Sequence, residues 1–138
     1  MKLSRQERSA IQDTLAHYAW AMDTGDIEGV VVTFTVDACV KDTTGKIWGP
    51  PDGPRQFATH FLTPNRGARQ HWLQHMMLEE IGEGEWKLTS YWLRVASDSG
   101  NAPALQLQGR YSDTFAKLNG QWLMKQKLID LWDSKPIG

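Results

Sequence analysis

Apolar side chains recur every three or four positions in the first part of the chain, at Ile11, Leu15, Tyr18, Ala19 and Met22. This spacing places them on one face of an α-helix, which we predict over residues 4–24. Ser4 followed by Glu7 has the pattern of a capping box at the start of that helix. Gly25 suits the left-handed conformation that ends many helices.

Weaker patterns follow. Residues 27–34 favour a short second helix, although their run of three valines suits a strand equally well. Residues 38–41 favour a short strand. Residues 45–54 contain three glycines and three prolines and are predicted to form a loop. Residues 55–62 then suit a third helix.

The second half of the chain has long segments of strand type, predicted at residues 71–81, 86–96, 104–116 and 122–132. Turn residues separate them at 82–85, at 97–101 and at Asn119-Gly120, a strong hairpin signal. We therefore predict an α+β domain over residues 1–138, with three helices covering one face of a four-stranded antiparallel meander. Apolar residues on both faces of these strands indicate that the other face meets a second subunit.

Composition excludes several classes of function. The 138 residues are 41% apolar and carry a net charge of −1, without clustered Lys or Arg, so no nucleic acid is expected as a partner. The single cysteine, Cys39, cannot form an internal disulfide. Nowhere do about 18 apolar residues run together, so no membrane segment is expected. We expect a cytoplasmic protein.

Two of the four histidines, His71 and His75, lie four positions apart. On a helix they would be spaced to bind one zinc ion, but no third ligand is identifiable. On a strand they would lie about 13 Å apart, too far to share an ion. The remaining alternatives are an acid–base site and simple packing. We expect neither a metal nor another cofactor.

Several motifs resemble those of one superfamily: residues 18–26, 34–38 and 49–57, His71 at the start of a strand, and residues 109–113 leading through Asn119-Gly120 to Trp122. In order and spacing they resemble the nuclear-transport-factor-2-like superfamily, in its SnoaL-like branch of polyketide cyclases, scytalone dehydratase, a dehydrochlorinase and steroid isomerases. The resemblance implies a cone-shaped α+β barrel, with three helices packed in the concave face of a curved, mainly antiparallel sheet. It also implies an apolar pocket open at one end.

The resemblance further implies a catalytic pair, Asp23 and His71. Asp23 shares a helix face with Tyr18 and Met22, so we expect it to point toward the pocket and to need a partner there. His71 matches the family histidine that such an aspartate binds, and it would act as a general base. The alternative is that Asp23 only caps a turn while His71 packs against Trp72.

Other residues are candidates for substrate binding. Tyr18 would bind a substrate oxygen or fill the core, and His75 would line the pocket, supply an acid or merely pack. Lys127 matches a cationic group of the dehydrochlorinase, with a surface lysine as the alternative. Arg94 and Arg110 are further candidates for binding an anion. Met22 and Tyr111 are also assigned to the pocket, together with those tryptophans that point inward among Trp20, Trp48, Trp72, Trp92 and Trp132.

These observations predict a small, cofactor-independent lyase or isomerase that dehydrates, isomerises or cyclises an apolar cyclic small molecule by proton transfer. The alternative is a non-catalytic subunit of the same fold that binds a small ligand or serves assembly. A metal protein using both His71 and His75 is a third alternative. In each case a homodimer or homotrimer is expected, because an uncovered apolar sheet face promotes association.

Overall fold

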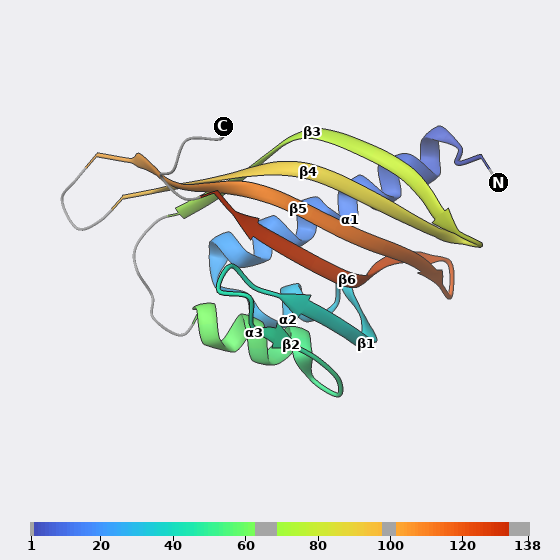
Figure 1. Cartoon of the computed structure of the whole chain (residues 1–138), viewed down its shortest axis with the longest axis horizontal. Coiled ribbons are helices and arrows are strands. Elements are labelled where there is room, and N and C mark those ends of the chain that lie inside the picture. The colour runs from blue at the N-terminus through green and yellow to red at the C-terminus, as the bar shows by residue number, and fades with distance from the viewer. Residues whose placement is uncertain (1, 63–68, 98–101, 133–138) are drawn as a thin grey trace.

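The computed structural model describes residues 2–62, 69–97 and 102–132. These residues form three helices and six strands, and the strands make one curved, unclosed sheet (Figure 1). The elements are α1 (Arg5–Thr24), α2 (Ile27–Val31), β1 (Phe34–Lys41), β2 (Ile47–Trp48), α3 (Gly53–Leu62), β3 (Arg69–Gly82), β4 (Glu85–Ala96), β5 (Ala104–Leu118) and β6 (Gln121–Leu131).

The strand order is β2-β1-β6-β5-β4-β3, so β2 and β3 form the two edges of the sheet. Only the β1–β6 pair among these strands is parallel. The helix α1 runs along the inner face of the sheet, and α3 lies beside β1 and β2 at one end (Figure 1). The predicted α+β class, with helices packed in the concave face of a mainly antiparallel sheet, is confirmed.

The first helix forms as the sequence predicts. Oγ of Ser4 accepts a hydrogen bond from the backbone N–H of Glu7 at 3.1 Å and caps the helix. Gly25 ends it in the left-handed conformation, with φ of +73°. The apolar face is buried against the sheet, with Ile11 and Leu15 fully excluded from solvent. This face anchors the C-terminal half of α1 beside the pocket.

The prediction for residues 27–34 is partly wrong. The second helix ends at Val31, and Phe34 already belongs to β1, which begins four residues before the predicted strand. Phe34 pairs with Met124 of β6, whereas Val30 and Val31 remain in the helix and Val32 caps it. The sheet therefore gains a strand, β1, that lies between β2 and β6 and that the predicted meander lacks.

The predicted loop at residues 45–54 contains the two-residue strand β2, which pairs with β1. The third helix starts at Gly53 rather than at Arg55, with Pro54 in its first turn, where a missing N–H costs nothing. Gly53 is tightly enclosed, because a Cβ atom there would lie 2.3 Å from the backbone oxygen of Trp48. The loop is thus held directly against the start of α3.

The predicted hairpin at Asn119-Gly120 is present, and both residues have positive φ. Most of the predicted turn at 97–101 lies outside the described residues. The four long strands agree with the predicted ones, except that their ends differ by up to two residues. The helical alternative for the segment that holds His71 and His75 is wrong, because the whole segment lies within β3.

Two β-bulges reverse the facing of side chains along the long strands. The β3–β4 register shifts between Gln74 and Met77, and His75 has φ of +55° there. The β5–β6 register shifts so that Thr114 pairs with Gln126 and Phe115 with Met124. Side chains beyond each bulge consequently point to the face opposite to the one that strict alternation predicts.

Candidate active site

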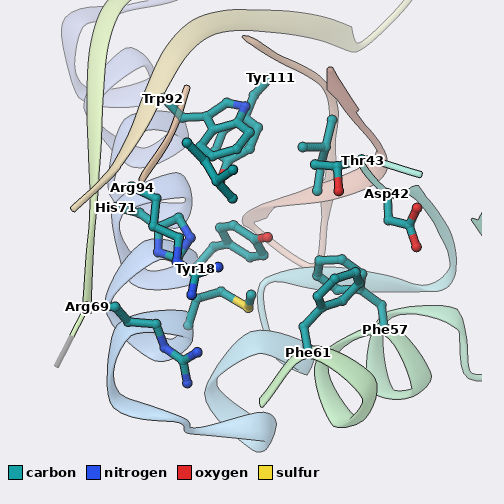
Figure 2. A pocket seen from close by; sticks show the side chains of 13 residues that line it. Tyr18, Asp42, Thr43, Phe57, Phe61, Arg69, His71, Trp92, Arg94 and Tyr111 are labelled. Atoms are coloured by element: carbon teal, nitrogen blue, oxygen red, sulfur yellow. The ribbon is translucent and has the colours of Figure 1, made fainter. Parts of the chain in front are cut away.

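The candidate site is a pocket between the C-terminal half of α1, α3 and the concave face of the sheet (Figure 2). About 80 Å³ is open to the centres of water-sized molecules, which suits a compact ligand. Most of the lining is aromatic or aliphatic, with Arg69, His71 and Arg94 on one side of the pocket and Asp42 and Thr43 on the other (Figure 2). The lining residues are Tyr18, Met22, Asp42, Thr43, Phe57, Phe61, Arg69, His71, Trp92, Arg94, Leu107, Tyr111 and Ile129.

Asp23 and His71 form a hydrogen-bonded pair at the wall of this pocket. Nδ1 of His71 lies 2.6 Å from Oδ1 of Asp23. The backbone N–H of His71 also donates to both carboxylate oxygens of Asp23, at 3.0 and 3.2 Å. The last turn of α1 is thereby fixed to the start of β3. With Asp23 as acceptor, the proton of a neutral His71 resides on Nδ1, and Nε2 keeps its lone pair.

Asp23 does not line the pocket, contrary to the expectation. It lies in a neighbouring groove between α1 and β3, whereas His71 lines both the groove and the pocket. The reason is helical geometry, since Asp23 is rotated by about 100° from Met22, which does face the pocket. The carboxylate therefore reaches His71 from the solvent side and keeps partial contact with water, its side chain being 16% exposed.

Aromatic rings form the back of the pocket. The indole of Trp92 stacks on Tyr111 with ring centroids 5.6 Å apart and an interplanar angle of 16°. Tyr18 meets Tyr111 edge to face at 6.1 Å. Gly109 makes room for this arrangement, because a Cβ atom there would lie 1.8 Å from the backbone oxygen of Asp130 and 2.8 Å from Nε1 of Trp92. The rings offer a flat, rigid surface to a ligand.

A buried ion pair lies behind these rings. Nζ of Lys127 lies 3.1 Å from Oδ1 of Asp113, and both side chains are fully excluded from solvent. The same nitrogen lies 3.4 Å from the ring centroid of Tyr111 and 4.2 Å from that of Tyr18. Burial lowers the pKa of Lys127 to about 8, against the attraction of Asp113. Burial likewise raises the pKa of Asp113, against the attraction of Lys127.

The two tyrosines are held in the protonated form. Burial is the largest cause that raises the pKa of Tyr18, and the nearby Tyr111 and Asp113 raise it further. Burial and the charge of Asp113 also raise the pKa of Tyr111. Both hydroxyls therefore remain hydrogen-bond donors at neutral pH.

Asp42 lines the pocket opposite the histidine. Its carboxylate accepts hydrogen bonds from the backbone N–H groups of Thr44 and Lys46, the hydroxyl of Thr44 and Nε1 of Trp48. Burial raises its pKa, but these hydrogen bonds outweigh burial and leave the pKa lowered. Asp42 thus stays ionised and holds together the loop between β1 and β2.

The family model for the SnoaL-like domain matches residues 4–127. The chain belongs to the SnoaL-like family. This result confirms the resemblance inferred from the motifs. A comparison with curated protein sequences finds no match.

Solved structures share this SnoaL-like fold. Aln2 from a Streptomyces species is 18% identical with a TM-score of 0.84, over 95% of this chain and 94% of that one. ActVI-ORFA from Streptomyces coelicolor is 20% identical with a TM-score of 0.81, over 91% and 97%. A hexachlorocyclohexane dehydrochlorinase, LinA type 2, is 18% identical with a TM-score of 0.79, over 96% and 90%. At these identities the likeness establishes the fold alone.

The structure of this SnoaL-like chain brings together most of the predicted site residues. The pocket is lined by Tyr18, Met22, His71, Trp92 and Tyr111. Of the five tryptophans proposed for the pocket, all of them within the described residues, only Trp92 lines it. Trp20 and Trp72 line the groove beside it instead.

His75 is not in the pocket, so its predicted place there is wrong. It follows the bulge in β3, and its ring lies 5.3 Å from that of Tyr91 on the outer face of the sheet. His71 and His75 therefore lie on opposite faces and cannot bind the same ion. More generally, no group of three His, Cys, Asp or Glu side chains within the described residues is placed to hold a metal ion.

Lys127 lies behind the pocket rather than in its lining, and the alternative of a solvated surface lysine is also wrong. The bulge in β6 turns it inward onto Asp113. Of the two candidate anion-binding residues, Arg94 lines the pocket, while Arg110 is half exposed and pairs with Asp130 at 3.3 Å.

No helix in the described ranges is both long enough and apolar enough to cross a membrane.

The sequence interpretation missed Asp42 and Arg69. Asp42 looks like an ordinary turn residue, because the hydrogen-bond donors that surround it lie in an irregular loop. Arg69 precedes the predicted start of its strand at residue 71, whereas β3 begins at Arg69 itself. Its spacing of two residues from His71 could have placed Arg69 in the pocket, since positions i and i+2 share one face of a strand.

Proposed function

We propose that this chain is a small enzyme of lyase or isomerase type, in which His71 is the general base. The hydrogen bond between Nδ1 of His71 and Asp23, at the wall of an apolar pocket, is the observation that carries the proposal. An imidazole oriented by a carboxylate, with its second nitrogen available to a ligand, is suited to abstract a proton from carbon.

The proposed reaction begins when Nε2 of His71 takes a proton from a carbon atom of the bound substrate. The electron pair of the broken C–H bond forms a new double bond. In a lyase reaction a leaving group departs with its own electron pair, and the imidazolium returns the proton to it. In an isomerisation the proton returns to another carbon. The carboxylate of Asp23 stabilises the imidazolium through its hydrogen bond to Nδ1.

Tyr18 is the proposed partner for a substrate oxygen. Its raised pKa keeps the hydroxyl protonated, so Tyr18 donates a hydrogen bond rather than acting as a base. Negative charge that develops on a carbonyl oxygen during proton abstraction would be stabilised by this donor. The apolar lining strengthens that interaction, because little water remains in the pocket when a ligand fills it.

The proposed substrate is a compact ring compound. Trp92 and Tyr111 present stacked rings at the back of the pocket, and Phe57 and Phe61 face them from α3 (Figure 2). Flat ligands gain most from contact with such rings. The cavity of about 80 Å³ favours one or two rings over a larger polycyclic compound.

Hydrogen–deuterium exchange tests proton transfer without knowledge of the substrate. Cyclohexanone and 2-tetralone carry acidic C–H groups next to a carbonyl, and mass spectrometry measures their uptake of deuterium in D₂O. We expect the protein to accelerate exchange and His71→Ala to reduce the acceleration by about 10²–10⁴-fold. His75→Ala, on the outer face, is the matched control and should retain the activity.

Either of two results would contradict the proposal. One is full exchange activity in a folded His71→Ala variant. The other is binding of these ketones by the wild-type protein without accelerated exchange, which would favour a ligand-binding subunit that performs no catalysis.

We further propose that a second copy of the chain covers the outer face of the sheet. No helix in the described part of the chain packs on that face (Figure 1). Large apolar side chains are exposed there at Trp72, Met77, Tyr91 and Leu105. A surface of this kind, spread over three neighbouring strands, is typical of a homo-oligomer interface.

A further inference from the structure

Two arginines and the proposed base lie together on one wall of the pocket. Arg69 and His71 are two positions apart on β3, so their side chains share the inner face. Arg94 is the direct partner of His71 on β4. All three line the pocket, and Figure 2 shows them along the same side of it, beside Tyr18. Two guanidinium groups thus flank the imidazole in a largely apolar cavity.

Arg69 is placed to bind something besides the protein. Its Nε atom is buried, yet no atom of the described residues accepts a hydrogen bond from it. A buried donor without an acceptor is costly, and such groups are often explained by a ligand. Arg69 also lines both the pocket and the adjoining groove, so it stands at the border of the pocket.

The nearby carboxylates do not depend on Arg69 for their hydrogen bonds. Asp23 accepts its hydrogen bonds from His71. Asp42, the other acidic residue at the pocket, accepts from Thr44, Lys46 and Trp48. The positive charge of Arg69 is therefore not matched by either acidic side chain of this region.

We propose that Arg69 and Arg94 form a subsite for a carboxylate group of the ligand. The inference deepens the proposed function, on which it rests, because it narrows the substrate class from cyclic compounds in general to ring compounds that bear a carboxylate. Guanidinium groups suit this ligand, since their planar N–H donors match the two oxygens of a carboxylate.

The subsite would also orient the substrate. A carboxylate held by Arg69 and Arg94 directs the attached ring inward, toward Trp92 and Tyr111. His71 neighbours both arginines, since Arg94 is its direct partner on β4 and Arg69 lies two positions away on β3. The carbon atoms next to the carboxylate-bearing position are then the ones nearest the imidazole. Binding energy from the charged group would fix the reacting C–H bond relative to the base.

Benzoate and benzamide provide a direct test, because they have nearly the same shape and differ in charge. Their dissociation constants are measured by NMR titration with the wild-type protein and with the Arg69→Gln and Arg94→Gln variants. We expect the wild type to prefer benzoate by at least about tenfold. Each variant should lose most of that preference while its affinity for benzamide stays within about twofold.

Two kinds of control variant keep the result interpretable. Arg5→Gln removes the same charge from an exposed position at the far end of α1 and should leave the preference unchanged. Arg69→Lys and Arg94→Lys keep the positive charge and should retain part of the preference. The NMR spectrum of each variant reports whether it is folded.

The outcomes separate this inference from the proposed function. Equal affinity of the wild type for benzoate and benzamide overturns the carboxylate subsite, whatever the exchange assay on His71 gives. A benzoate preference that Arg5→Gln removes as strongly as Arg69→Gln also overturns it. A preference that depends on Arg69 and Arg94 supports the subsite even if His71→Ala leaves proton exchange unchanged, in which case only the catalytic proposal fails.

Discussion

Asp23 accepts hydrogen bonds from both the backbone N–H and the ring Nδ1 of His71, at 3.0 and 2.6 Å. These contacts join residues 48 positions apart in the sequence. The backbone contact fixes where β3 begins relative to α1. The ring contact fixes which nitrogen of His71 carries the proton.

The first prediction concerns Asp23→Asn. The amide NH₂ of asparagine can donate to Nδ1, which favours the tautomer protonated on Nε2 and removes the lone pair that faces the ligand. We expect the proton-exchange activity to fall toward that of His71→Ala, by about 10²-fold or more. Nitrogen-15 NMR of the imidazole should report the change of tautomer.

Asp13→Asn is the matched control, because Asp13 is an exposed residue of the same helix. It should change neither the tautomer nor the exchange rate. An Asp23→Asn variant that keeps Nδ1 protonated and full activity would show that Asp23 serves only to connect α1 and β3.

The second prediction concerns the buried ion pair. Lys127→Met leaves Asp113 buried without its partner, and we expect a loss of about 3–5 kcal/mol in the free energy of unfolding. Adding Asp113→Leu should recover much of that loss, because the unpaired charge is removed. Urea unfolding measures all three proteins. Lys125→Met, which removes an exposed lysine of the same strand, should have little effect.

The third prediction is the pH dependence of this ion pair. Burial lowers the pKa of Lys127 to about 8, from an ordinary value of 10.5. Between these values the unfolded chain binds a proton that the folded chain has released, so the free energy of unfolding rises with pH. We expect the wild type to gain stability relative to Lys127→Met from about pH 8 to pH 10. A difference that does not change over this range would contradict the lowered pKa.

The fourth prediction concerns Gly109→Ala. The added methyl group would lie 1.8 Å from the backbone oxygen of Asp130 and 2.8 Å from Nε1 of Trp92, so β5, β6 or the indole has to move. We expect a loss of at least about 3 kcal/mol in the free energy of unfolding and an altered near-ultraviolet circular dichroism spectrum. Gly49→Ala meets no atom within 4 Å and should be tolerated.

The fifth prediction concerns assembly through the outer face. Tyr91 is 43% exposed near the middle of that face and contacts the ring of Trp132 at 5.3 Å. We expect light scattering to find a dimer or trimer for the wild type and a monomer for Tyr91→Glu, because a charge in an apolar interface is strongly unfavourable. Gln6→Glu on α1 is the control. A wild-type protein that is monomeric at all accessible concentrations would refute the proposal.

Much of the fold follows from local patterns in the sequence. The cap at Ser4, the left-handed Gly25 and the hairpin at Asn119-Gly120 lie where local rules place them. The errors occur where contacts between distant segments decide the outcome. Residues 34–41 illustrate this, because their partner is β6 at the other end of the chain, and no local pattern reveals that pairing.

The positions of His75 and Lys127 both follow from bulges. A single extra residue in a strand reverses the facing of everything beyond it, and neither bulge has a glycine or proline that would mark it in the sequence. His75 is turned outward in this way and Lys127 inward. The pair of Asp23 and His71 was predictable only through the family resemblance, because no periodicity links α1 to β3.

The groove between α1 and β3 gives Asp23 a contact with water outside the pocket. A ligand can therefore dry the pocket completely without stripping the hydration from the carboxylate. The carboxylate that orients the imidazole lies on one side of the wall, and the apolar pocket in which we propose the reaction lies on the other. Because Asp23 keeps its contact with water, the chain can hold this carboxylate next to an apolar pocket without the full cost of burying a charge.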